Sequence, residues 1–158
     1  LLLVNTKIGG MYMEMMSMLE SAMAEIALWE LFAQSRGANA TVFLATVIAV
    51  WVAARFSSVM LDKGANTVGK VLCTAFAIGV FLLGFNLGGW INGTYEGHAG
   101  ALAALDAANG SIDLGAGSQQ FIENMKSGGN TIGAVAAWLF YGAGFLIAVL
   151  PLWISPKD

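Results

Sequence analysis

Three long stretches of the chain contain no charged residue. They have 18, 25 and 30 residues and cover residues 37–54, 71–95 and 127–156. A helix needs about 20 mostly apolar residues to cross a hydrocarbon core about 30 Å thick. These stretches lack the regular alternation of polar and apolar positions that marks a membrane-spanning β-strand, so they predict helices. We expect transmembrane helices near residues 39–60, 69–91 and 131–153.

Residues 11–34 have a different pattern, with one apolar and one acidic side. The apolar positions follow a helical period and are Met15, Leu19, Ala22, Ile26, Trp29 and Ala33. Glu20 and Glu25 lie on the opposite side. A fourth transmembrane helix near residues 12–34 would turn both carboxylates toward protein partners, because ionisable groups at membrane depth avoid lipid.

The alternative for residues 12–34 is an amphipathic helix that lies in the membrane interface. Such helices usually carry Lys or Arg on their polar face, whereas this polar face carries only acids. The fourth span is therefore preferred, with a tight turn at Gly37, Ala38 and Asn39 leading into the next helix. The sequence thus predicts an all-α integral membrane helical bundle with four transmembrane helices, or three plus one interfacial helix, in a single domain over residues 1–158.

The composition requires lipid as the solvent for much of the chain. The 158 residues are 58% hydrophobic and 11% charged, whereas soluble domains have about 25% charged residues. The net charge of -3 and the seven basic residues leave no patch for nucleic acid. Cys73 is the one cysteine, which excludes an internal disulfide framework. The expected partners are membrane lipids and the subunits of larger membrane proteins.

The charges also predict an orientation. The 55–70 connection holds Arg55, Lys63 and Lys70 against Asp62, whereas the charges of the 92–130 connection are mostly acidic. A basic excess in short loops marks the cytoplasmic side. We therefore expect loop 55–70 in the cytoplasm and the extramembrane loop 92–130 in the periplasm, the lumen or the exterior. With four spans, Lys7 and Lys157 would also lie on the cytoplasmic side.

The long loop contains two helical candidates, over residues 100–110 and 118–125. A connection of this length in a compact protein is usually functional or flexible. It is the surface that we expect to contact other molecules outside the membrane.

Small residues recur at helical spacing in the expected spans and predict close contacts between helices, since small side chains let backbones approach in lipid. They are Ala45, Ala49 and Ala53 in the 39–60 helix, Gly79, Gly84 and Gly88 in the 69–91 helix, and Gly133 and Gly144 in the 131–153 helix. Small faces on two sides of the 69–91 helix indicate neighbours on both sides.

Few residues suggest chemistry. Six of the eight methionines lie within residues 11–23, and Met11, Met15 and Met18 would share one helical face. Thioethers select Cu(I), so these three are candidate copper ligands, although methionine also serves simply as an adaptable packing residue. Glu20 and Glu25, as intramembrane acids, are candidates for a proton or cation path. His98, the one histidine, falls in the loop, with no histidine or cysteine ligand nearby.

These patterns favour a non-catalytic accessory or structural subunit of a larger membrane complex, of the kind found in respiratory, photosynthetic or copper monooxygenase assemblies, with no cofactor and no enzymatic activity. The two alternatives are a small transporter or channel component that uses Glu20 and Glu25, and a Cu(I)-handling protein that uses the methionine cluster.

Overall fold

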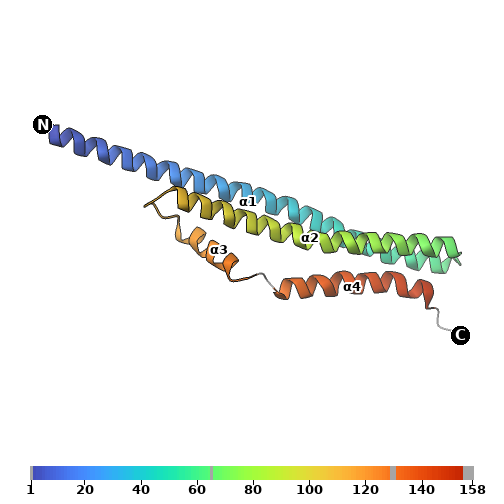
Figure 1. Ribbon diagram of the computed structural model, residues 1–158. Coiled ribbons are helices and arrows are strands. Elements are labelled where there is room, and N and C mark those ends of the chain that lie inside the picture. Colours follow the sequence, from blue (N-terminus) through green and yellow to red (C-terminus); the bar gives the residue numbers. More distant parts are fainter. Residues whose placement is uncertain (1, 65, 129–130, 155–158) are drawn as a thin grey trace. The chain divides into compact units, whose positions relative to one another are not determined.

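The computed structural model describes the backbone of residues 2–64, 66–128 and 131–154. Side chains are described for the same residues except residues 2–6 and Thr131. The described residues form no strand and fold into α1 (Leu2–Asp62), α2 (Thr67–Ala108), α3 (Ala116–Lys126) and α4 (Thr131–Trp153), labelled in Figure 1. The predicted all-α class is confirmed. Three helices in the described part, α1, α2 and α4, are long and apolar enough to cross a membrane. Lys157 lies outside the described residues.

The turn predicted at Gly37, Ala38 and Asn39 is not formed. These residues lie inside α1, which is 61 residues long in total. A glycine that ends a helix usually takes a left-handed conformation, and the described glycines with positive φ are Gly64, Gly110 and Gly128. One glycine inside a helix costs only about 1 kcal/mol relative to alanine, so the helix continues. Residues 12–34 and 39–60 are therefore parts of one helix, which counts as one candidate span, and the number of membrane crossings stays a prediction.

The expected loop at 92–130 is largely helical. α2 has 42 residues, and a helix of that length extends about 63 Å, roughly twice the thickness of the hydrocarbon core. Its last part includes most of the helical candidate at 100–110, and it ends before Gly110, whose φ is +66°. The second candidate, at 118–125, is α3.

The chain divides into two compact units. Unit 1 comprises Leu1–Arg36 and Gly93–Gly129, and unit 2 comprises Gly37–Asn92 and Asn130–Asp158. The boundaries fall where the charge pattern changes: unit 2 contains all three spans predicted from the uncharged stretches, at 39–60, 69–91 and 131–153. Helices α1 and α2 each contribute one part to each unit, α3 belongs to unit 1, and α4 belongs to unit 2.

Unit 2 is built around small residues where its helices meet. Ala53 of α1, Ala77 of α2 and Ala148 of α4 are buried together, with Phe145 and Val149 packed against them. The connection between α1 and α2 is short because Gly64 turns the chain with a φ of +69°. The Asn66 side chain then caps α2, accepting the Gly69 backbone N–H at 2.9 Å.

Unit 1 packs α3 against the first part of α1 and the last part of α2. Its core consists of the buried residues Leu102, Leu114 and Ile122. Partly buried residues surround this core and come from all three helices; they are Leu28, Trp29, Ala103, Leu105 and Phe121. The cores of the two units thus differ in side-chain size, with leucine and isoleucine in unit 1 and alanine in unit 2.

Candidate functional site

A cluster of aromatic rings in unit 1 surrounds His98. The His98 ring stacks on Phe32 with 4.3 Å between centroids and meets the edges of Trp29 and Phe121 at 4.6 Å and 5.2 Å. Tyr95 completes the cluster, with 5.1 Å between its ring and that of Phe32. His98 is 8% exposed. The sequence placed His98 in a loop, whereas it lies on α2 and points into the core of unit 1.

The imidazole of His98 is held in an apolar environment. Its Nε2 atom is buried and has no hydrogen-bond partner. Burial removes water from the ring and disfavours the charged imidazolium, so the pKa of His98 lies below its ordinary value of 6.5. Burial in this core therefore favours the neutral form of His98. Among the described residues, no three His, Cys, Asp or Glu side chains gather as a metal site.

Glu25 fixes the start of α3. The N-cap of α3 is Gly115, which has no side chain to accept the first backbone N–H groups. The Glu25 carboxylate accepts the Gly115 N–H, with N···O distances of 3.1 Å and 3.2 Å. A negative charge at this end also interacts favourably with the helix dipole. Glu25 thus binds the N–H of the N-cap residue from a distant part of the sequence, as the acid of a capping box does from within its own helix.

Ser118 links Glu25 to the aromatic cluster. Its hydroxyl donates to Glu25 Oε1 at 2.5 Å and accepts the indole N–H of Trp29 at 2.8 Å. The same arrangement continues toward the end of α2, where the Asn109 side-chain amide donates to Ser21 Oγ at 2.5 Å. These contacts attach α3 and the end of α2 to α1. The position of Glu25 is therefore explained by a structural contact within the chain.

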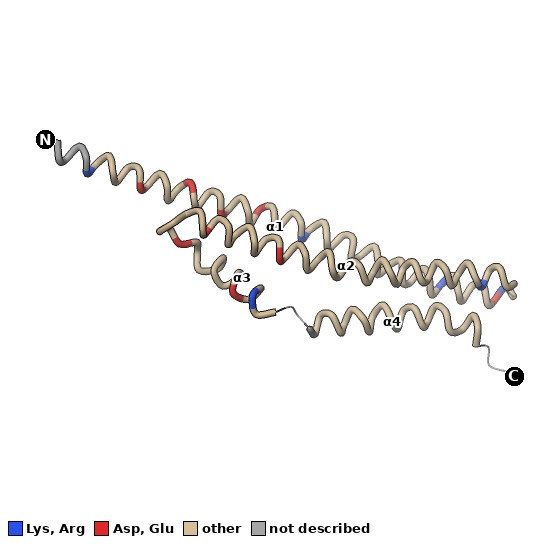
Figure 2. The backbone as a smooth tube through the Cα atoms, viewed as in Figure 1, with Lys and Arg blue, Asp and Glu red and all other residues tan. Residues whose placement is uncertain are grey.

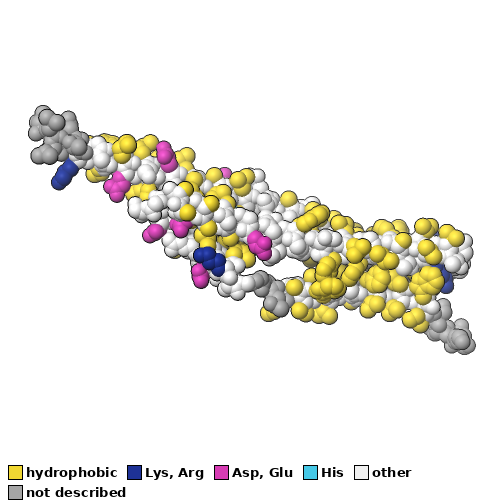
Figure 3. All heavy atoms as spheres, in the orientation of Figure 1, with side chains coloured by type: hydrophobic (Ala, Val, Ile, Leu, Met, Phe, Trp, Pro, Cys, Tyr) yellow, Lys and Arg dark blue, Asp and Glu magenta, His cyan; other side chains and the backbone are white. Residues whose placement is uncertain are grey.

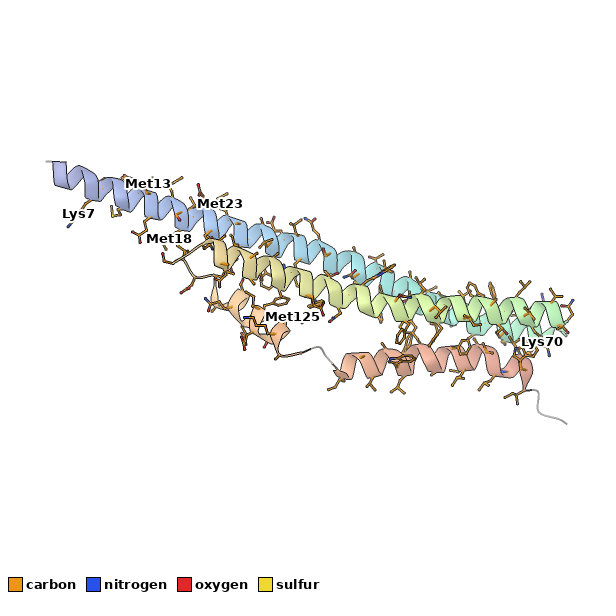
Figure 4. All side chains as sticks on the ribbon, in the orientation of Figure 1. Lys7, Met13, Met18, Met23, Lys70 and Met125 are labelled. Carbon is orange, nitrogen blue, oxygen red and sulfur yellow. The ribbon has the colours of Figure 1, made fainter. Side chains whose placement is uncertain are left out.

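The other candidate residues of the N-terminal segment are exposed. All side chains of residues 7–20 are exposed, including Glu20 and the methionines Met11, Met15 and Met18. Figure 4 shows Met13, Met18 and Met23 standing out from α1 as part of the same segment. Met11, Met15 and Met18 share one side of a continuous helix, as their spacing predicts. Copper binding by these thioethers stays a prediction.

Three of the predicted small residues lie at helix contacts within unit 2. Ala53 is in its core, and Gly84 and Gly144 lie where a methyl group would meet Tyr141 and Val50, respectively. The other five positions are more open. A methyl group added at Gly79 or Gly88 would have no neighbouring atom within 4 Å, Ala45 and Gly133 are exposed, and Ala49 is half-buried.

Sequence reasoning missed the polar contacts that define the site. Trp29 was assigned to an apolar stripe, and its position on that stripe did not indicate that its N–H bonds Ser118. The one available signal for Glu25 was the glycine at the start of a short helix, which leaves that helix without a cap of its own. Comparison with protein families, with curated proteins and with solved structures finds no match for this chain.

Proposed function

We propose that this protein is a non-catalytic subunit of a larger membrane-protein complex, with unit 2 in the lipid and unit 1 outside it. One observation carries the proposal: the first part of α1 presents large apolar side chains that no described residue of unit 1 covers. Exposed fractions on this segment reach 64% for Met11, 58% for Tyr12 and 76% for Met13. Large exposed apolar patches on a water-facing surface mark interaction sites.

Lipid is a poor explanation for this surface. The segment also carries the exposed acids Glu14 and Glu20. It is not needed to cross the membrane, because the uncharged residues 37–54 of the same helix are long enough for a span. Figure 3 shows apolar side chains on α1 interleaved with acidic ones, whereas the visible face of α2 and α4 in unit 2 is dominated by apolar groups. The exposed apolar residues of unit 2 suit lipid, and those of unit 1 suit protein.

The distribution of charge supports the same placement. Unit 1 contains eight acidic and three basic residues, whereas the 55–70 connection contains three basic residues and one acid (Figure 2). With three spans, both parts of unit 1 fall on one side of the membrane and the 55–70 connection on the other. The basic excess favours the cytoplasm for the connection, which puts unit 1, with Lys7, in the periplasm, the lumen or the exterior. This reverses the side expected for Lys7 with four spans.

Site-specific photocrosslinking in the native membrane tests the proposal. A photoreactive residue at Leu19 should give one discrete, larger adduct that identifies a stoichiometric partner, because that side chain is 53% exposed on the apolar segment. The control position is Leu139 of α4, an exposed side chain of unit 2, which should give mainly lipid adducts. Adducts with lipid alone at Leu19 and at every other exposed position of unit 1 would contradict the proposal.

Cysteine labelling tests the orientation. In a chain with Cys73 replaced by Ala, single cysteines replace Thr67, at the start of α2, and Ser111, just after α2. An impermeant maleimide should label the second cysteine in intact cells and the first only after the membrane is opened. The reverse pattern would place unit 1 in the cytoplasm.

A further inference from the structure

Exposed apolar residues on the first part of α1 follow the spacing of a coiled coil. Steps of four and three residues alternate along the α1 seam, which we define as Ile8, Tyr12, Met15, Leu19, Ala22 and Ile26. This spacing repeats every seven residues and keeps one narrow stripe facing a partner helix. All six side chains are exposed, between 43% for Ile8 and 59% for Ile26 among the large ones. The seam is therefore a helix-packing surface that no helix of the described residues covers.

Methionines border the seam on both sides. Met11 and Met18 lie along one edge, and Met16 and Met23 lie along the other, all more than half exposed. Unbranched thioether side chains adapt to irregular partner surfaces. Together with the seam they form an apolar face wider than the two positions per heptad that a simple pair of helices uses. On a face of this width, the partner would bury the bordering methionines as well as the seam.

The charges around the seam select the partner. Residues 8–35 contain four acids and no base; Glu25 is bonded to α3, and the other three are exposed. A second parallel copy would bring Glu25 of one chain toward Glu30 of the other, since these residues occupy the flanking positions that meet across a parallel coiled coil. Anionic lipid headgroups would be repelled in the same way. A surface with Lys or Arg beside its apolar residues would instead be attracted.

We propose that the α1 seam binds an amphipathic helix of another subunit whose apolar face is flanked by basic residues. This inference rests on the proposed function, and it adds where the partner binds and what chemistry the partner presents. Recognition combines burial of the seam and its methionines with attraction between the basic flanks and Glu30, the exposed acid at a flanking position of the seam. The contact lies wholly within unit 1.

A model peptide tests the proposal on the full chain. The chain is placed in phosphatidylcholine nanodiscs, and binding of a fluorescent Leu/Lys amphipathic helix is measured by anisotropy against empty nanodiscs. Replacing Leu19 and Ile26 by Ser should weaken binding by about tenfold or more, because two buried anchors are lost. The matched control is Leu31→Ser, a side chain 60% exposed on α1 but off the seam, which should bind as the wild type does.

Charge is tested separately. A Leu/Glu peptide of the same length should not bind, and Glu30→Gln should weaken Leu/Lys binding and reduce its salt dependence. Equal binding of both peptides, or equal binding by the wild type and the Leu19→Ser, Ile26→Ser variant, would overturn the inference. So would a wild-type dimer that this double variant dissociates, because the occupant would then be a second copy.

The two proposals fail in different ways. If photocrosslinking finds a stoichiometric partner at other exposed positions and the Leu19→Ser, Ile26→Ser chain still assembles with it, the seam proposal is wrong and the proposed function stands. If photocrosslinking finds no protein partner at any exposed position of unit 1, the proposed function is wrong and the inference that rests on it is wrong as well.

Discussion

The Tyr141 hydroxyl lies 2.9 Å from Thr46 Oγ1, and this hydrogen bond joins α4 to α1 inside unit 2. Both side chains are buried, at 3% and 2% exposure. The Thr46 hydroxyl donates its one hydrogen to the Phe43 carbonyl of its own helix at 2.7 Å. It therefore accepts the hydrogen bond that the Tyr141 hydroxyl donates. In lipid, such a contact satisfies two hydroxyl groups that water does not reach.

Removing the Tyr141 hydroxyl should weaken the packing of α4. Tyr141→Phe and Thr46→Val are each expected to lower the unfolding free energy by about 0.6 kcal/mol, the usual value of a hydrogen bond between membrane helices. The double variant should lose less unfolding free energy than the two single variants together, because both changes delete the same hydrogen bond. Denaturant titration in detergent micelles measures these values. Thr41→Val is the control, since Thr41 is exposed and donates to Gly37 within α1; an equal loss there would contradict the assignment.

Gly84 is expected to tolerate no side chain. A methyl group at this position would overlap the Tyr141 ring, whereas the same group at Gly88 meets no atom within 4 Å. Gly84→Ala should therefore destabilise unit 2 by about 1–3 kcal/mol, since a packed ring must move. Gly88→Ala should leave the melting temperature in micelles unchanged or slightly raised. Similar melting temperatures for both variants would show that Tyr141 does not pack on Gly84 in solution.

Loss of the Glu25 carboxylate should loosen α3. Glu25→Ala removes the acceptor of the Gly115 N–H and leaves that group without its partner, at a cost of about 1–2 kcal/mol. Amide hydrogen exchange in residues 116–126 should then be faster by about tenfold, while exchange in unit 2 stays the same. Glu20→Ala is the matched control, because Glu20 is exposed on the same helix. Unchanged exchange in the Glu25 variant would show that α3 does not depend on this cap.

Acidification should destabilise unit 1 through His98. Burial lowers the pKa of His98 below 6.5 in the folded chain, so the unfolded chain binds the proton more readily. The stabilisation is complete above pH 6.5 and is lost as the pH falls below that value. Hydrogen exchange of α3, corrected for its intrinsic pH dependence, should show this loss between pH 7.5 and 5. His98→Phe keeps a ring in the cluster and should abolish that part of the pH dependence; an unaltered profile would assign the effect to other groups.

The sequence was most informative about unit 2. Runs without charge depend only on composition, and they located the three segments that form this unit. The continuity of α1 was not predictable in the same way, because Gly37 is compatible with both a turn and a helix interior and its neighbours decide between them. The tight contact at Gly84 was partly predictable, since its spacing with Gly88 indicates a small face but not which of the two residues meets a neighbour.

The polar contacts were beyond the reach of local patterns. Tyr141 and Thr46 are 95 residues apart, and each looks like an ordinary member of an apolar run. Glu25 was interpreted as an acid at membrane depth because the helix around it was taken for a span. Its acceptor role involves a backbone N–H, which every residue except proline provides, so no side-chain signal could have identified Gly115 as the partner.

The dependence of α3 on Glu25 has a consequence for how the chain acquires its structure. α3 has 11 residues, which is short of the roughly 12–15 residues at which isolated helices become even marginally stable. The carboxylate at its start comes from a residue 90 positions earlier, so we expect α3 to form only once it has docked. A peptide cut from residues 116–126 should be a random coil, and any event that draws Glu25 away should unwind the helix from its first turn.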